Sequence, residues 1–330
     1  MNNENTHREV PLVGAPAPAT RLFGWGMLSV LTAFTISNVL VIGWEFRGLG
    51  ELAEWNADSM AIAAIYAILI LLSSYWVLRT PHRSLRQDAR IISDFNAWLI
   101  RGCFFAVLFT GIADSIIAFL RVEGLLDNIF SDQIARDMTR SHFIGPWIHF
   151  PLMVAGFSAA LFSRTLGFCW LALLIVAAEL LIVFSRFVFS YEQALMGDLV
   201  RYWYAALFLF SSAYTLMEEG HVRVDVFYAG FKNSVKGRIN AIGTILLGMT
   251  TSWTIILIGM GSKQAIVNSP VFNFEVSQSG TAGMFIKYQM AAFLAIFAIT
   301  MLIQFISYLF EAVADMRSEP GKREFAAISH

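Results

Sequence analysis

Long apolar runs, each close to the length that crosses a bilayer, dominate the pattern of this chain. A spanning helix needs about 20 mostly apolar residues. Eight segments come near this length: residues 22–44, 60–78, 99–120, 143–162, 167–189, 202–217, 237–261 and 283–309. None shows the period-two alternation of a β-barrel strand. The pattern predicts an all-α integral membrane protein with about eight transmembrane helices.

Composition agrees with a membrane protein and excludes an ordinary soluble domain. Hydrophobic residues make up 57% of the 330 residues and charged residues only 14%, against roughly 25% charged residues in soluble domains. The formal net charge is −1, which gives no indication of a nucleic-acid partner.

The distribution of charge predicts the orientation of the chain. With the N-terminus in the cytoplasm, most lysines and arginines fall in cytoplasmic loops, as the positive-inside rule requires. The first loop on the opposite side is acidic, with Glu45, Glu51, Glu54 and Asp58. Eight spans with both termini in the cytoplasm, in a bacterial inner membrane, satisfy this distribution.

Ionisable residues inside predicted spans are functional candidates by default, and three of them stand out. They are Asp114 in the third span, and Glu179 and Arg186 in the fifth. Arg186 is near the end of its span and can extend to the headgroups. For Glu179 and Asp114 two alternatives stay open: a hydrogen bond to another helix that orients the bundle, or coupling to an ion.

Residues that suggest a cofactor or a catalytic centre are lacking in the sequence. Cys103 and Cys169 have no CxxC spacing. His142 and His149, seven residues apart, are expected on one face at the membrane interface, and no other span contains a histidine that would complete a bis-histidine haem site. No phosphate-binding loop, dinucleotide fingerprint or nucleophile elbow occurs. We therefore expect no cofactor, no metal, no catalytic residue and no enzymatic activity.

Small residues in the seventh span predict close helix packing. Thr244, Gly248 and Ser252 follow one another at four-residue spacing, and such stripes allow two helix backbones to approach. Gly156 and Ala160 form a shorter version in the fourth span.

A dense polar block follows the sixth span. Glu218, Glu219, His221, Arg223 and Asp225 stand close together at the membrane boundary. In an extended segment His221, Arg223 and Asp225 share one face; in a helix Arg223 pairs with Glu219. By itself the block is more typical of a solvated turn beside the membrane.

The block resembles the signature of the small permease subunit of tripartite ATP-independent periplasmic (TRAP) transporters, the DctQ family. The resemblance begins upstream at Tyr214, Thr215 and Leu216. It continues in the second half of the chain at Glu275, Ser277, Gly283, Lys287 and Gln304. It implies a structural or subunit-docking role for Glu218, Glu219, His221, Arg223, Asp225, Glu275, Ser277, Lys287 and Gln304.

The resemblance covers only part of the chain and implies a division into two regions. Residues 166–330 are expected to form a DctQ-like four-helix small-permease domain, and residues 1–165 an N-terminal four-helix membrane region of unassigned role. In that family the small subunit widens the scaffold of a large permease subunit. A periplasmic substrate-binding protein delivers an organic acid or related solute, and an ion gradient drives uptake.

The extra N-terminal region leaves two alternatives open. One is a membrane docking subunit of another inner-membrane complex that reuses a DctQ-like domain. The other, a membrane enzyme or electron-transfer anchor, lacks the nucleophiles and ligands that such proteins need.

Overall fold

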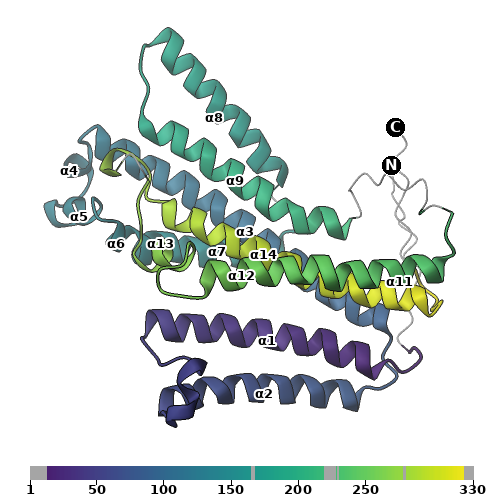
Figure 1. Ribbon diagram of the computed structural model, residues 1–330. Helices are drawn as coiled ribbons and strands as arrows, with labels where there is room; N and C mark the ends of the chain where they lie inside the picture. The colour runs from purple at the N-terminus through teal and green to yellow at the C-terminus, as the bar shows by residue number, and fades with distance from the viewer. Residues whose placement is uncertain (1–12, 165–167, 219–227, 229, 278–279, 323–330) are drawn as a thin grey trace. The chain divides into compact units, whose positions relative to one another are not determined.

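A computed structural model describes residues 13–164, 168–218, 228, 230–277 and 280–322 of the chain. The signature residues Glu219, His221, Arg223 and Asp225 lie outside the described residues, so their predicted role stays a prediction. Within the described part, regular structure is almost entirely helical (Figure 1), apart from an isolated antiparallel bridge between Val13 and Arg83. The predicted all-α class is confirmed.

The helices follow the apolar runs closely. The first half contains α1 (Pro18–Gly43), the 3-10 turn η1 (Leu49–Glu54), α2 (Ala57–Arg79), α3 (Leu85–Val122), α4 (Leu126–Ile129), α5 (Asp132–Asp137), α6 (Ser141–Ile144), the π-helix η2 (Gly145–His149) and α7 (Phe150–Phe162). The second half contains α8 (Phe168–Val188), α9 (Ala194–Met217), α11 (Asn233–Gly243), the π-helix η3 (Thr244–Met249), α12 (Thr250–Met260), α13 (Asn268–Phe272), the 3-10 turn η4 (Gly280–Ala282) and α14 (Lys287–Met316).

Seven helical runs in the described residues are long and apolar enough to cross a membrane, which makes this a multi-pass membrane protein. They are α1, α2, α3, the continuous run Ser141–Phe162, α8, the continuous run Asn233–Met260, and α14. The sixth predicted span forms a helix of 24 residues, α9, but it is not among the seven. Asp198 and Arg201 near its start, and its tyrosines and serines, lower its hydropathy.

The π-helix η2 changes which residues of its span face inward. The N–H of Phe150 bonds to the carbonyl of Gly145, five residues back, instead of four. Pro151 lacks an N–H, which weakens the regular ladder here. A π-turn adds a residue and rotates the side chains beyond it around the helix axis. His142 is exposed whereas His149 is completely buried. The prediction that both histidines share an interfacial face is therefore wrong for His149.

The described chain forms two compact units, and neither coincides with a sequence half. Unit 1 takes residues from 1–96, 215–254 and 301–330, and unit 2 from 97–214 and 255–300. Each unit therefore combines residues that precede position 165 with residues that follow it. The boundary near residue 165 is a boundary in the sequence and stays a prediction.

In unit 1 the C-terminal part of α14 packs closely against α1, α11 and η3. A Cβ atom placed on Gly24 of α1 would lie 2.4 Å from the Phe310 ring, and one on Gly248 of η3 would lie 2.8 Å from the Phe305 ring. Thr244 and Ser252 are buried. The small-residue stripe of the seventh span is thus a helix-packing face, as predicted, while α2 lies against α1 on the outside (Figure 1).

In unit 2 the backbones of α3 and α7 come into direct contact. A Cβ atom on Gly156 would lie 2.4 Å from the backbone nitrogen of Ala106. The rings of Phe104, Phe210 and Phe293 pack beside this contact, with centroids 5.6 Å and 4.9 Å apart along the series. This close packing brings polar side chains of α3, η2, α9 and α14 together.

Candidate functional site

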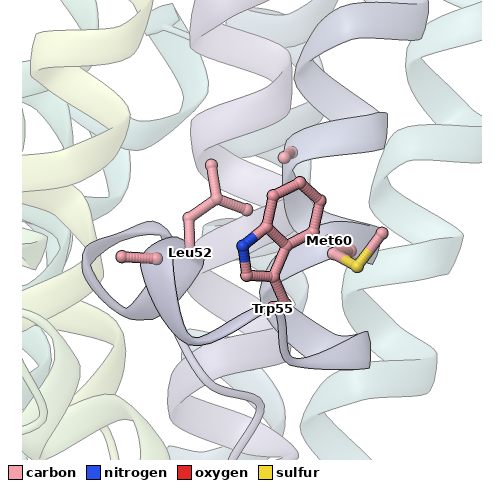
Figure 2. Close-up of a pocket in the computed structure, with 5 residues that line it drawn as sticks. Leu52, Trp55 and Met60 are labelled. Carbon is pink, nitrogen blue, oxygen red and sulfur yellow. The ribbon is translucent and has the colours of Figure 1, made fainter.

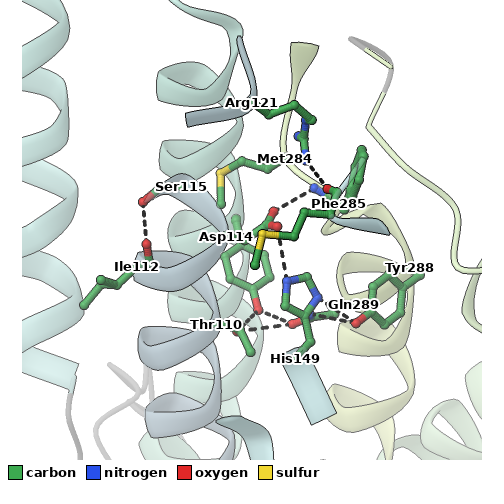
Figure 3. A network of polar contacts seen from close by, with 12 residues as sticks. Thr110, Ile112, Asp114, Ser115, Arg121, His149, Met284, Phe285, Tyr288 and Gln289 are labelled. Atoms are coloured by element: carbon green, nitrogen blue, oxygen red, sulfur yellow. Dashed lines mark hydrogen bonds and ion pairs between the residues drawn. The ribbon is translucent and has the colours of Figure 1, made fainter. Parts of the chain in front are cut away.

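A buried polar network lies in unit 2, at the point where four helices meet (Figure 3). We call it the Asp114 network. It consists of Thr110 and Asp114 from α3, His149 from η2, Tyr202 from α9, and Tyr288 and Gln289 from α14. All six side chains are buried. Residues from both halves of the sequence therefore build one site.

His149 occupies the centre of the Asp114 network. Its Nε2 lies 3.2 Å from Asp114 Oδ1, and its Nδ1 lies 2.8 Å from the Tyr288 hydroxyl oxygen and 2.9 Å from Gln289 Nε2. A phenol O–H and an amide N–H both donate, so Nδ1 is the acceptor. The imidazole proton is then on Nε2 and faces the Asp114 carboxylate.

The other side of Gln289 extends the network. Its Oε1 accepts hydrogen bonds from the Tyr202 hydroxyl and from Thr110, the latter at 3.3 Å. Thr110 Oγ1 also lies 2.7 Å from the Tyr202 hydroxyl oxygen. Buried polar networks in which the groups satisfy one another rigidify a core and specify its packing.

The Asp114 network is joined to the segment that leads into α14, residues 281–285, which we call the strap. Asp114 Oδ2 accepts a hydrogen bond from the N–H of Phe285 at 2.7 Å, and Asp198 Oδ2 accepts one from the N–H of Met284 at 3.1 Å. Arg121 donates to the carbonyls of Thr281, at 2.7 Å, and Gly283. Two carboxylates and one guanidinium therefore fix the path of the backbone into α14.

Two predicted signature residues meet beside the strap. Lys287 Nζ lies 2.6 Å from Glu275 Oε2, and the N–H of Tyr288 bonds to the Glu275 carbonyl at 3.1 Å. The N–H of Ser277 bonds to the carbonyl of Met284 at 3.4 Å. Glu275, Ser277 and Lys287 thus close the loop that carries the strap.

The remaining signature residue inside a span, Gln304, belongs to a second buried polar group in unit 1. Asn96 Nδ2 donates to Gln304 Oε1 at 3.2 Å, and Gln304 Nε2 donates to Ser93 Oγ at 3.1 Å. Ser93 also lies 2.8 Å from Ser307, which donates to the Ala89 carbonyl. These contacts join α3 to α14.

Two arginines in unit 1, Arg86 and Arg21, are buried and hold helix ends together. The charge distribution in the sequence indicated them only as cytoplasmic charges that set the orientation of the chain. Arg86 is 2% exposed; it binds Glu311 and lies 2.8 Å from Asp315 Oδ1, and it donates to the carbonyl of Pro320 at 2.9 Å. Arg21 Nε lies 2.7 Å from Asp88 Oδ2 and is fully buried. In the sequence, the one sign that these arginines form buried ion pairs is that they lie near the ends of predicted spans.

The remaining candidates are at the surface. Glu179 is exposed, and no hydrogen bond or ion pair from it is found among the described residues. Arg186 is also exposed and its Nε lies 3.8 Å from Glu192 Oε2. Glu218 is exposed at the end of α9. A hydrogen bond from Glu179 to another helix, one of the two alternatives, is not found among the described residues.

An apolar groove opens in unit 1 beside η1 and the start of α2 (Figure 2). It has a volume of about 560 Å³ and is lined by Leu52, Ala53, Trp55, Met60 and Ala63. Trp55 adopts a left-handed backbone, with φ 50°, and its side chain is 81% exposed. Tryptophan is typical of membrane interfaces, and the lining of the groove is mostly apolar.

Metal-binding groups of three or more His, Cys, Asp or Glu side chains are not found in the described ranges. Cys103 is buried and Cys169 is exposed, and both are free thiols. The polar contacts described above link helices and loops to one another.

Comparison with known proteins identifies one part of the chain. Residues 172–315 match the family model of the DctQ component of tripartite ATP-independent periplasmic transporters. No curated protein and no solved structure matches the chain. The match begins in α8 and ends in α14, so helices α1 to α7 lie outside it. The predicted resemblance is confirmed: the C-terminal part of this multi-pass membrane protein is similar to the DctQ component of TRAP transporters.

Proposed function

We propose that this chain is the small membrane subunit of a TRAP transporter. It scaffolds a large permease subunit during ion-gradient-driven uptake of an organic acid or related solute, which a periplasmic binding protein delivers. The observation that carries the proposal is the DctQ match over residues 172–315. The chain has no catalytic role in this proposal.

The contacts of the buried polar side chains support a scaffolding role for the chain. In the Asp114 network they bond to one another and to the strap. In unit 1, Gln304 bonds to Asn96 and Ser93 on α3. Such contacts fix helix positions, which suits a rigid element against which another subunit moves.

We infer that residues 1–165 enlarge this scaffold. Asp114 from this region holds Phe285, and Arg86 holds Asp315. Each pair joins the N-terminal region to the DctQ-like segment inside one unit: Asp114 and Phe285 in unit 2, and Arg86 and Asp315 in unit 1. The N-terminal region then acts as a brace for α14 and not as a separate module.

For the location we propose the bacterial inner membrane with both termini in the cytoplasm. This orientation requires an even number of spans, so α9 must cross as well as the seven more apolar helical runs. Impermeant thiol reagents applied to single-cysteine variants at position 221 test it. Labelling from the periplasmic side contradicts the proposed orientation.

Co-purification in mild detergent tests the function. We expect a large multi-span permease to accompany the chain, and uptake of an organic acid to fail when the chain is deleted. We further expect Arg223→Ala and Asp225→Ala to reduce recovery of the permease while the binding protein still captures substrate. Recovery at the wild-type level from both variants contradicts a docking role for the signature block.

A second function is favoured by one observation: α1 to α7 lie outside the family match. The alternative is a docking subunit of another inner-membrane complex. The identity of the co-purified partner separates the two, because an unrelated membrane complex in place of a permease selects the alternative.

A further inference from the structure

Two membrane-length helices are left largely uncovered. In α2 and in α8 only 11% of the apolar window is buried, a smaller share than in any other of the seven spans. Figure 1 shows α8 at the outer edge of unit 2. An exposed apolar helix normally faces lipid, so exposure alone does not distinguish the two helices.

The positions of ionisable residues do distinguish them. In α2 the charged residues, Asp58 and Arg79, stand in the first and last turns, where they reach the headgroups. In α8, Glu179 is near the middle of the apolar sequence and is exposed. A carboxylate facing hydrocarbon is costly, and such residues almost always face protein or a polar cavity.

The described part of the chain provides no partner for Glu179. Arg186, two helical turns away on the same side of α8, is oriented toward Glu192 at 3.8 Å. The partner of Glu179 is therefore expected on another polypeptide. Its side chain must donate a hydrogen bond or carry positive charge at the same depth in the membrane.

The surface beside Glu179 is an exposed apolar side of α8. Exposed residues recur at spacings of three and four along α8: Cys169, Leu173, Val176, Leu180, Phe184 and Phe187. These spacings place the six side chains on one stripe of the helix. Glu179 lies about 100° around the helix from Leu180 and flanks this stripe, which we call the α8 face.

We propose that the α8 face binds a transmembrane helix of the large permease subunit, which presents a cationic or hydrogen-bond-donating side chain to Glu179. The inference rests on the proposed function and names the surface that serves it. The DctQ match begins on this helix and excludes α2. A second copy of the chain is disfavoured, because a two-fold interface on this face brings two Glu179 carboxylates together.

Site-directed cross-linking in membranes that also contain the permease tests the surface. The background variant is Cys169→Ser, and Cys103 is buried. A single cysteine at Leu180 probes the α8 face. A cysteine at Leu171, which is buried on the same helix, and one at Leu71, which is 67% exposed on α2, are matched controls. Each carries a short thiol-linked photoreactive group.

We expect Leu180→Cys to cross-link to the permease and both controls to give no such product. Products with a second copy of the chain, products with lipid alone, or cross-links to the permease from Leu71→Cys instead of Leu180→Cys overturn the proposal.

Substitution of Glu179 tests the chemistry. Glu179→Leu is expected to reduce co-purified permease by at least about tenfold, because the partner's donor becomes buried without an acceptor. Glu179→Gln keeps a carbonyl acceptor, and we expect a smaller loss. Leu72→Ala, at an exposed position on α2, is the control and should leave recovery unchanged.

The readouts separate the two proposals. Glu179 is exposed in the isolated chain, so Glu179→Leu should elute and melt like the wild type without the permease. If the wild-type chain captures no permease, the proposed function fails. If it captures the permease and Glu179→Leu does so equally well, only the inference about the α8 face fails.

Discussion

His149 Nε2 lies 3.2 Å from Asp114 Oδ1, and neither side chain is exposed. The two residues come from different helices, and the π-helix η2 turns His149 inward. The same carboxylate binds the N–H of Phe285 in the strap. One aspartate thus connects η2 and the entrance of α14 to α3.

The first prediction concerns Asp114. Asp114→Ala leaves the N–H of Phe285 without its acceptor and removes the carboxylate that lies 3.2 Å from His149 Nε2, and an unsatisfied buried donor costs about 1–3 kcal/mol. We expect a lower melting temperature in detergent. Asp114→Asn keeps one oxygen acceptor and should lose less. Equal melting temperatures for wild type and Asp114→Ala contradict the role given to this carboxylate.

The second prediction concerns Arg86. Its guanidinium binds Glu311 and Asp315 together with two backbone carbonyls. Arg86→Ala is expected to cost about 3 kcal/mol, the lower end for breaking a buried ion pair, because Glu311 is 32% exposed. Arg86→Lys keeps the charge but not the forked geometry and should restore only part of the stability.

The control for Arg86 is an exposed arginine. Arg47 pairs with Glu51 and Glu54 on η1, and all three side chains are about half exposed or more. Exposed pairs of this kind contribute about 0–1 kcal/mol. Denaturation in a detergent titration should therefore show Arg47→Ala close to the wild type. A larger loss from Arg47→Ala than from Arg86→Ala reverses the expected order.

The third prediction compares two glycines in helices. At Gly156 an added Cβ meets the backbone of Ala106 at 2.4 Å, so Gly156→Ala must push α7 away from α3. Such overpacking typically costs about 1–3 kcal/mol. At Gly26 of α1 nothing lies within 4 Å, so Gly26→Ala should stabilise by up to about 1 kcal/mol through helix propensity. Thermal melts of the two variants should shift in opposite directions.

The fourth prediction concerns Glu275 and Lys287, whose charged atoms lie 2.6 Å apart. Lys287 is 50% exposed and Glu275 is 32% exposed, so the pair should add only about 0–1 kcal/mol to stability. If it serves subunit docking, Glu275→Lys and Lys287→Glu should each reduce recovery of the permease with little change in melting temperature. The double swap should restore recovery in part. Full recovery with either single swap argues for a local structural role.

Several features were predictable because they depend on neighbouring residues. The length of each apolar run predicted most helix ends to within a few residues. The exceptions are the start of α3 at Leu85 instead of 99, the start of α9 at Ala194 instead of 202, and the end of α14 at Met316 instead of 309. The stripe around Gly248 indicated close packing, since helical spacing alone places Thr244, Gly248 and Ser252 on one face. The motif residues indicated the DctQ resemblance, which the match at 172–315 confirms.

Contacts between distant residues depended on the tertiary structure. Helical periodicity put His149 beside His142, but a π-turn at residues 145–149 rotated it toward Asp114. Glu179 and Asp114 had the same alternatives in the sequence, yet one is exposed and the other fully buried. Hydropathy records the cost of placing a carboxylate in an apolar run. It carries no information on which distant donor offsets that cost, because this depends on how separate helices pack.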